Sequence, residues 1–179
     1  GKDYRNRLNK NWGIVDSEDC KAVAKSLIQK GLVDESRIVI FGNSAGGFTA
    51  LNSLCNEKLF KAAICKYPVI DLKEMHFNTH RFEKYYLNSL VGDFDSNKDI
   101  YYERSPINKI DQISQPVLIF HGKEDPVVDY SISLKFHKKL LSKNIYSEIY
   151  LYDDEGHGIK DMKNQVNYLL NTELFLNKI

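Results

Sequence analysis

The chain has 179 residues, which is enough for one domain with a sizeable hydrophobic core. Apolar residues make up 42% of it and aromatic residues 12%, as in globular proteins, while the formal net charge is +1. A charge so close to zero provides no general attraction to nucleic acid or to an anionic membrane. No apolar stretch approaches the roughly 20 residues that span a bilayer. We therefore expect neither a nucleic-acid partner nor a membrane.

The cysteines indicate a reducing environment. Cys20, Cys55 and Cys65 are widely spaced, lie in apolar or helical surroundings and form no C-x-x-C pair. Their spacing gives no sign of a metal or redox site, and buried free thiols are typical of a reducing compartment. The amino terminus is polar and has no signal-peptide core. We expect a cytoplasmic protein without a metal or a cofactor.

Helices and strands alternate along the chain. Residues 1–15 have no clear period. The capping residues of segment 16–19, the apolar stripe that follows them, and Lys30 and Gly31 predict a helix that ends at about residue 30. Continuous or alternating apolar runs predict strands at 37–41, 62–67, 116–120 and 147–152. Further helices are predicted after Ser44, near 82–91, at 132–141 and from about 161 to 176.

This alternation is typical of the α/β class, in which helices cover both faces of a mostly parallel sheet. Right-handed crossovers between parallel strands place all their carboxyl ends at the same edge. Sites in open α/β sheets lie at that edge. The residues that follow each strand are therefore the candidates for a functional site.

A glycine-flanked serine follows the first predicted strand. The segment reads GNSAGG and comprises Gly42, Asn43, Ser44, Ala45, Gly46 and Gly47. Glycine two positions before and after a serine matches the sharp strand-to-helix turn of the G-x-S-x-G pattern. In that turn the apex is strained and its neighbours at plus and minus two approach each other, so we expect that both must lack side chains. An ordinary glycine-rich turn gives the same pattern, and partners are needed to separate the two.

A carboxylate and an imidazole follow two other predicted strands. Asp125 comes after strand 116–120 and His157 after strand 147–152, so the chain order with Ser44 is Ser, Asp, His. That is the order of an α/β-hydrolase triad. A serine hydroxyl needs a base to become a nucleophile, and histidine can accept its proton and return it to the leaving group. A buried carboxylate orients the imidazole and stabilises its charged form.

Other residues compete for the roles of base and acid. His121 ends a predicted strand and is the rival base, although a histidine at a strand end commonly has a structural role. Asp129 is a rival acid, but it stands near the start of the next helix. Asp153 and Asp154 belong to a run of three acids, which we expect to be exposed.

The remaining histidines give a weak metal signal. His76 and His80 have the i, i+4 spacing that puts two imidazoles on one helix face. These two residues and His137 lie in helical or irregular polar segments, where exposed side chains are the simpler expectation. We therefore predict no metal site.

Several longer segments carry a resemblance to a known family. They are YRxxLNxxWGIVD (4–16), RIVIFGNSAGG (37–47), HRFExxYL (80–87), YxRSP (102–106), PVLIFHGxxDxVV (116–128) and EGHG (155–158). Together they run nearly from end to end. With them the sequence resembles the catalytic domain of prolyl oligopeptidase family serine peptidases, in particular the dipeptidyl aminopeptidase and acylaminoacyl-peptidase-like branch.

The resemblance implies a role for each candidate. Ser44 is the nucleophile, Asp125 the acid and His157 the base, and the backbone N–H of Ala45 is one oxyanion donor. It implies a serine peptidase that hydrolyses short peptides through an acyl-enzyme. An esterase or lipase on the same scaffold, and a catalytically inactive fragment or assembly domain, are the alternatives.

The resemblance also implies that residues 1–179 are a fragment of an α/β-hydrolase domain. Family members begin several strands earlier, with a His-Gly-Gly type loop that completes the oxyanion hole, and usually carry a β-propeller. Because one oxyanion donor is typically worth about 10²–10³ in turnover, we expect the segment alone to be weakly active or inactive. The bare edge of strand 37–41 predicts either self-association or association with the rest of a parent chain.

Overall fold

The structure, a computed structural model, describes residues 1–55, 57–78 and 81–179, and of residues 81–84 only the backbone. The helices are α1 (Lys2–Asn6), α2 (Val15–Gln29), α3 (Ala45–Leu54), α4 (Leu72–Asn78), α5 (Arg81–Leu90), α6 (Lys98–Arg104), α7 (Tyr130–Ser142) and α8 (Met162–Leu176). Short 3₁₀ helices are η1 (Glu35–Arg37), η2 (Pro106–Asn108) and η3 (Ile110–Gln112).

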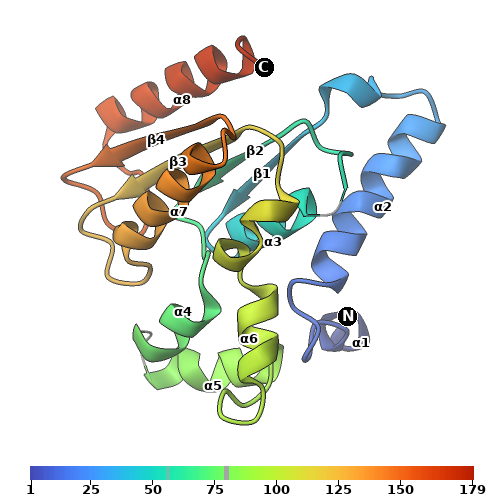
Figure 1. Ribbon diagram of the computed structural model, residues 1–179, viewed down its shortest axis with the longest axis vertical. Coiled ribbons are helices and arrows are strands. Elements are labelled where there is room, and N and C mark those ends of the chain that lie inside the picture. Colours follow the sequence, from blue (N-terminus) through green and yellow to red (C-terminus); the bar gives the residue numbers. More distant parts are fainter. Residues whose placement is uncertain (56, 79–80) are drawn as a thin grey trace.

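The strands form one parallel sheet. They are β1 (Val39–Asn43), β2 (Ala62–Lys66), β3 (Val117–Gly122) and β4 (Ser147–Tyr152), and they lie side by side in that order (Figure 1). The register places Gly42 opposite Cys65, and Cys65 opposite Ile119. The predicted parallel sheet is confirmed, and the carboxyl ends of these strands share one edge.

Helices cover both faces of this sheet (Figure 1). On one face, Leu51 of α3 and Phe136 of α7 belong to the same buried cluster as Ile119 of β3. On the other face, Phe175 of α8 belongs to the cluster that contains Phe120. Because the inner strands are buried on both sides, they read in the sequence as continuous apolar runs.

The long connection between β2 and β3 forms a helical lobe. It carries α4, α5 and α6, which Figure 1 shows grouped below the sheet. Trp12 and Phe48 join Tyr101 in the core of this lobe, and the Tyr101 hydroxyl donates to the carbonyl of Gly92 at 2.9 Å. The helix predicted near 82–91 is confirmed as α5, whereas α4 and α6 lie in a region that the sequence pattern leaves mixed.

Two element starts differ from their prediction. Helix α2 begins at Val15 without a side-chain cap, because the carboxylate of Asp16 accepts from Gly13 N–H at 2.6 Å and from the hydroxyl of Thr49. Strand β1 begins two residues later than predicted, because Arg37 belongs to η1, and it continues to the residue before Ser44. The second shift places the serine directly at the carboxyl end of the strand.

Candidate active site

Ser44 lies between β1 and α3 in a conformation that few residues other than glycine adopt. Its φ is 52° and its ψ is −118°. Backbone hydrogen bonds hold it on both sides: its N–H donates to Lys66 O at 2.9 Å, and Val69 N–H donates to its carbonyl at 3.1 Å. The serine thus has the strained backbone expected at the apex of this turn.

The glycines around Ser44 are not equivalent. A Cβ built at Gly42 lies 2.0 Å from the carbonyl oxygen of Gly46, and one built at Gly47 lies 2.5 Å from Cβ of Pro68. A Cβ at Gly46 meets nothing within 4 Å. The expectation that both flanking glycines must lack side chains is therefore wrong for Gly46, because only its backbone takes part in the close approach. Asn43 ends β1 with an exposed side chain.

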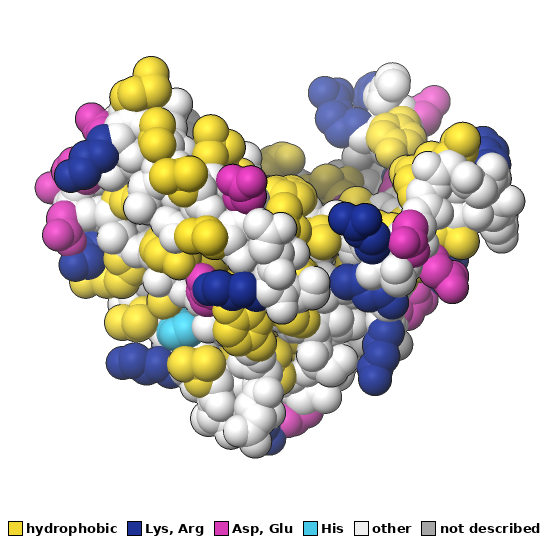
Figure 2. All heavy atoms as spheres, turned by 90° about the horizontal axis from the view of Figure 1, so that it is seen from above, with side chains coloured by type: hydrophobic (Ala, Val, Ile, Leu, Met, Phe, Trp, Pro, Cys, Tyr) yellow, Lys and Arg dark blue, Asp and Glu magenta, His cyan; other side chains and the backbone are white. Residues whose placement is uncertain are grey.

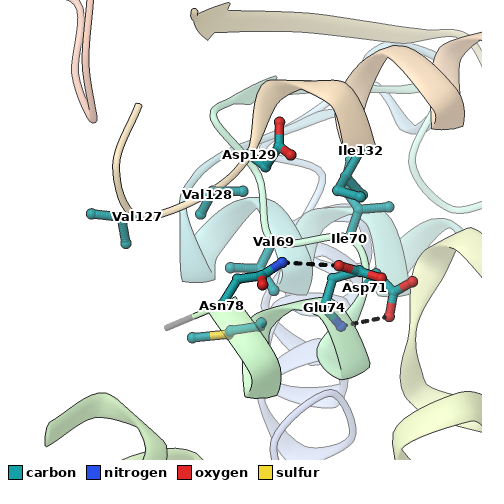
Figure 3. A pocket seen from close by; sticks show the side chains of 10 residues that line it. Val69, Ile70, Asp71, Glu74, Asn78, Val127, Val128, Asp129 and Ile132 are labelled. Atoms are coloured by element: carbon teal, nitrogen blue, oxygen red, sulfur yellow. Dashed lines mark hydrogen bonds between the residues drawn. The ribbon is translucent and has the colours of Figure 1, made fainter. Parts of the chain in front are cut away.

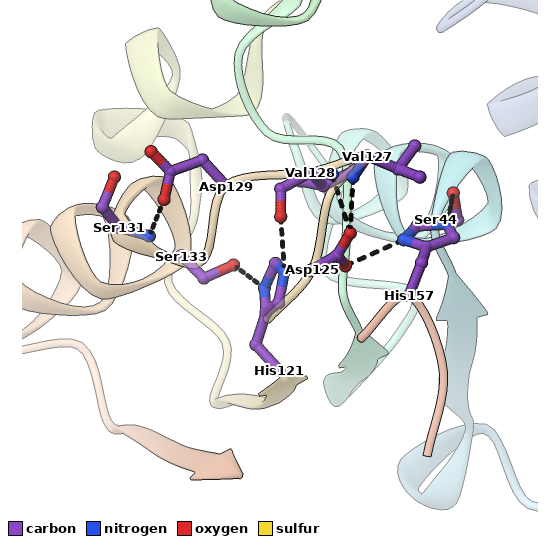
Figure 4. A network of polar contacts seen from close by, with 9 residues as sticks. All are labelled: Ser44, His121, Asp125, Val127, Val128, Asp129, Ser131, Ser133 and His157. Carbon is purple, nitrogen blue, oxygen red and sulfur yellow. Dashed lines mark hydrogen bonds and ion pairs between the residues drawn. The ribbon is translucent and has the colours of Figure 1, made fainter. Parts of the chain in front are cut away.

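The structure brings Ser44, Asp125 and His157 together (Figure 4). Nε2 of His157 lies 3.0 Å from Oγ of Ser44, and its Nδ1 lies 2.8 Å from Oδ2 of Asp125. The three residues come from the loops after β1, β3 and β4, so the shared edge of the parallel sheet is what joins positions more than a hundred residues apart. The distances are those of hydrogen bonds.

The carboxylate of Asp125 is buried and fully engaged. Its side chain has an exposed fraction of 0%, and Oδ1 accepts from Val127 N–H at 2.8 Å and Val128 N–H at 3.0 Å. Burial raises the pKa of this carboxyl, but hydrogen bonds from His121, His157 and the two backbone N–H groups outweigh that effect and hold the pKa well below its ordinary value. Asp125 is therefore an anion at neutral pH.

The loop of His157 packs directly against the loop of Asp125. A Cβ at Gly122 would lie 2.1 Å from the carbonyl of Glu155, so glycine is needed where β3 ends. That carbonyl accepts from Glu124 N–H at 2.9 Å, and the Glu155 carboxylate accepts from the N–H groups of Lys160 and Asp161. Glu155 is buried, so the expectation of a wholly exposed acidic run is wrong at its third position.

Tyr67 is a residue of this site that the sequence reasoning did not assign. Its ring centroid lies 4.6 Å from that of His157, and its φ is 38°. Burial, with smaller contributions from the charge of Asp125 and from Tyr168, raises the pKa of its hydroxyl. The Tyr67-Pro68 pair directly after a buried strand, at the same edge as Ser44, is the signal that could have identified it.

The rival acids and the rival base do not take the places of Asp125 and His157. Asp129 caps α7 by accepting from Ser131 N–H at 2.8 Å, and Asp153 is exposed and pairs with Lys123. Asp154 is exposed and accepts from the side chain of Asn164. His121 is fully buried on the far side of Asp125 (Figure 4).

The other histidines lie away from these residues. His76 is buried and stacks on Phe94 at 4.6 Å, so its predicted exposure is wrong; the aromatic cluster of the helical lobe covers it. His137 is half-buried and its Nδ1 lies 2.9 Å from Oγ of Ser147, so it too is less exposed than predicted. His80 lies outside the described residues.

The backbone N–H of Ala45 is a hydrogen-bond donor next to Ser44. Ala45 is the first residue of α3, and the N–H groups of a helix's first turn have no acceptor within the helix. The positive end of the helix dipole lies at the same point. An N–H in this position can stabilise negative charge that develops beside Ser44.

A small acidic pocket adjoins the Asp125 loop (Figure 3). It lies between Val127 and Val128 of that loop, Asp71 after β2, and Glu74 and Asn78 of α4. Its volume of ≈ 30 Å³ holds about one water molecule. Among the described residues, no group of three or more His, Cys, Asp and Glu is arranged to hold a metal ion.

Ser44 at a strand-to-helix turn, His157 and the buried Asp125 have the arrangement of a Ser-His-Asp triad at the edge of a parallel sheet. The class of fold is the α/β-hydrolase fold, of which these residues form a part. Residues 1–179 match the model of the prolyl oligopeptidase family throughout, and the chain belongs to that family.

Individual relatives agree with this assignment. Dipeptidyl aminopeptidase BIII of Pseudoxanthomonas mexicana is 29% identical over 98% of this chain and 26% of its own length. The structure of a Mycobacterium tuberculosis puromycin-hydrolyzing peptidase is 35% identical, with a TM-score of 0.95 over 98% of this chain and 27% of its own. Mouse inactive dipeptidyl peptidase 10 is 28% identical over 86% of this chain and 19% of its own length.

The chain spans about a quarter of the length of the first of these relatives. Within the described residues, no helix is both long enough and apolar enough to cross a membrane.

Proposed function

We propose that this chain carries the catalytic triad of a serine peptidase that hydrolyses short peptides through an acyl-enzyme. One observation carries the proposal: the imidazole of His157 bridges Ser44 and Asp125, at 3.0 Å and 2.8 Å. The peptidase names of relatives matching nearly the whole chain support the choice of an amide substrate.

Each side chain has a step in the proposed reaction. Nε2 of His157 accepts the proton as Ser44 Oγ attacks the substrate carbonyl, and the Ala45 N–H stabilises the oxygen that becomes negative. The imidazolium is stabilised by Asp125 and gives its proton to the leaving amine, which departs from the acyl-enzyme. Water then gives a proton to the same imidazole and attacks the acyl carbonyl. The bond to Ser44 Oγ breaks, and the imidazolium returns the proton to Oγ.

Labelling with a fluorophosphonate tests the nucleophile. We expect the full-length protein to be labelled and the Ser44→Ala variant to remain unlabelled, with Ser53→Ala as the control that keeps labelling, since Ser53 is a buried serine within α3. Absence of labelling in the parent protein would support a non-catalytic role, as the name of one relative, inactive dipeptidyl peptidase 10, describes.

A comparison of substrates tests the reaction class. We expect hydrolysis of a short peptide amide and of its matched ester, because both proceed through the same acyl-enzyme. Cleavage of the ester with none of the amide would replace the peptidase with an esterase.

Cell fractionation tests the location: the free thiols Cys20, Cys55 and Cys65 support a reducing compartment such as the cytoplasm.

A further inference from the structure

A second histidine contacts the same carboxylate from the side opposite His157. His121 has an exposed fraction of 0%, and its Nε2 lies 2.9 Å from the carbonyl oxygen of Val128 and 3.2 Å from Oδ2 of Asp125. Its Nδ1 lies 2.8 Å from Oγ of Ser133 on α7. Figure 4 shows the His121 ring between Ser133 and the turn that carries Asp125.

The neighbours of His121 determine which nitrogen carries the hydrogen. The carbonyl of Val128 can only accept a hydrogen bond, and the ionised carboxylate of Asp125 can only accept as well, so Nε2 must be the donor. Nδ1 is then free to accept from the Ser133 hydroxyl, which can donate. The surroundings therefore place a hydrogen on Nε2 of His121, while Nδ1 pairs with the hydroxyl of Ser133.

We propose that His121 is a positioning residue of the triad, which holds the carboxylate of Asp125 and shares its Oδ2 with His157. The inference rests on the function proposed above for Ser44 and His157. His121 has no contact with the nucleophile and acts only through Asp125.

The sharing has a chemical consequence. Oδ1 of Asp125 is fixed by two backbone N–H groups, so Oδ2 stays in place beside Nδ1 of His157 at 2.8 Å. On its other side lies Nε2 of His121 at 3.2 Å, whose N–H also bonds to the carbonyl of Val128. The N–H edge of His121 withdraws part of the negative charge that stabilises the protonated form of His157. His121 therefore shares with His157 the carboxylate oxygen that stabilises the imidazolium formed during the reaction.

Among the described residues, few other titratable groups face the hydrogen bonds that join His121, Asp125 and His157. His157 comes from the loop after β4. Tyr67 comes from the loop after β2, and because its pKa is raised, its hydroxyl is uncharged at neutral pH. From α7 the network receives the neutral Ser133, while Asp129 faces Ser131 instead.

Three variants of the full-length protein separate positioning from mere packing. In His121→Gln the amide nitrogen takes the place of Nε2, whereas in His121→Asn the amide reaches only the place of Nδ1. Ser133→Ala removes the contact on Nδ1 and leaves the Nε2–H donor. All three perturb the same buried network, and thermal unfolding measures how much stability each one loses.

The rate of fluorophosphonate labelling is then measured against pH. We expect the midpoint of its acidic limb to rise by about half a pH unit or more in His121→Asn, as for the loss of one charge-assisted hydrogen bond transmitted through a carboxylate. It should stay at the wild-type value in His121→Gln and Ser133→Ala. A midpoint that stays unchanged in His121→Asn, or that shifts equally in all three variants, would overturn the proposal.

Nitrogen NMR of histidine-labelled protein decides the question without catalysis and without a variant that might unfold. We expect the unsubstituted protein to show a hydrogen on Nε2 of His121, where Val128 O and Asp125 Oδ2 can only accept. The opposite tautomer would refute the inference even if Ser44 is fully reactive. Conversely, a hydrogen on Nε2 in a protein that the fluorophosphonate does not label would uphold the donor role of His121 and reject the catalytic function alone.

Discussion

At the scale of single residues, the site depends on a backbone that most side chains would prevent. Ser44 has a positive φ and is held there by bonds to Lys66 and Val69. Strained residues of this kind persist only where the surroundings fix them. Here the carbonyl of Gly46 comes so close to position 42 that no Cβ fits there, which lets β1 turn directly into α3.

Because Gly42 and Gly46 have different surroundings, we expect their replacement by alanine to change stability differently. We expect Gly42→Ala to lower the free energy of unfolding by roughly 1–3 kcal/mol or more, because its methyl group meets backbone that cannot move without disturbing Ser44. We expect Gly46→Ala to be neutral or to stabilise by up to about 1 kcal/mol, because the space is open and alanine favours helix. Urea denaturation of both variants provides the measurement. Equal losses at the two positions would contradict this account of the turn.

Some residue-scale features were visible in the sequence and others were not. The turn at Ser44 follows from the spacing of its glycines together with the placement of Asp125 and His157 after two other predicted strands. The contact of Tyr67 with His157 joins loops after different strands, and the burial of His76 depends on Phe94 and Tyr101. Such contacts are set by tertiary packing, for which a single sequence has no local signal.

At the scale of elements, the loop between β4 and α8 is built around one buried carboxylate. Glu155 accepts hydrogen bonds from the backbone of Lys160 and Asp161 and from the side chain of Asn164. Burial raises the pKa of Glu155, but these donors outweigh it and lower the pKa. The loop that they close carries His157, so its shape fixes the position of the imidazole.

We expect Glu155→Gln to weaken this loop, because the amide replaces an accepting oxygen with a donor that faces other N–H groups. The free energy of unfolding should fall by roughly 1–3 kcal/mol at neutral pH. Since the folded pKa of Glu155 is lowered, its contribution is present above the unfolded pKa of about 4.3 and is lost as pH falls below it.

Chemical denaturation of the parent protein and of Glu155→Gln, repeated from neutral to acid pH, measures that contribution. The difference between the two proteins should shrink as the solution is acidified. Asp154→Asn is the control, because its side chain is exposed and bonds only to Asn164 among the described contacts. A difference that is constant with pH would show that the carboxylate charge does not hold the loop.

Element prediction succeeded where the signal is local. The strands and α7 and α8 follow from apolar runs with the period of their structure, and Gly31, with φ 65°, ends α2 as expected. The start of α2 was misplaced because Asp16 bonds to Thr49, 33 residues away. Arg104 lies in one of the family-like segments and donates to the carbonyls of Lys10 and Trp12 in another, a contact across more than 90 residues that no local pattern reveals.

At the scale of the whole molecule, the sheet is unevenly covered. Among the described strands β1 pairs only with β2, and Phe41 on β1 has an exposed fraction of 53%. An apolar groove of ≈ 400 Å³ lies beside β1, with Val23 of α2, Ile38 and Phe60 in its lining. Figure 2 shows a hollow between two lobes of the molecule with hydrophobic side chains at its base. An edge strand of this kind offers free N–H and C=O groups to another chain.

We therefore predict that the 179-residue chain, produced by itself, associates through β1. Light scattering after size-exclusion chromatography should give a mass above the 20.7 kDa of one chain, rising with concentration. Phe41→Lys should shift it toward the single chain, because a lysine on an edge strand opposes pairing. Tyr102→Lys is the matched control: Tyr102 is 65% exposed on α6 and should leave the mass unchanged. If both variants dissociate the assembly equally, or if the unsubstituted 179-residue chain stays at 20.7 kDa at every concentration, β1 is not the contact.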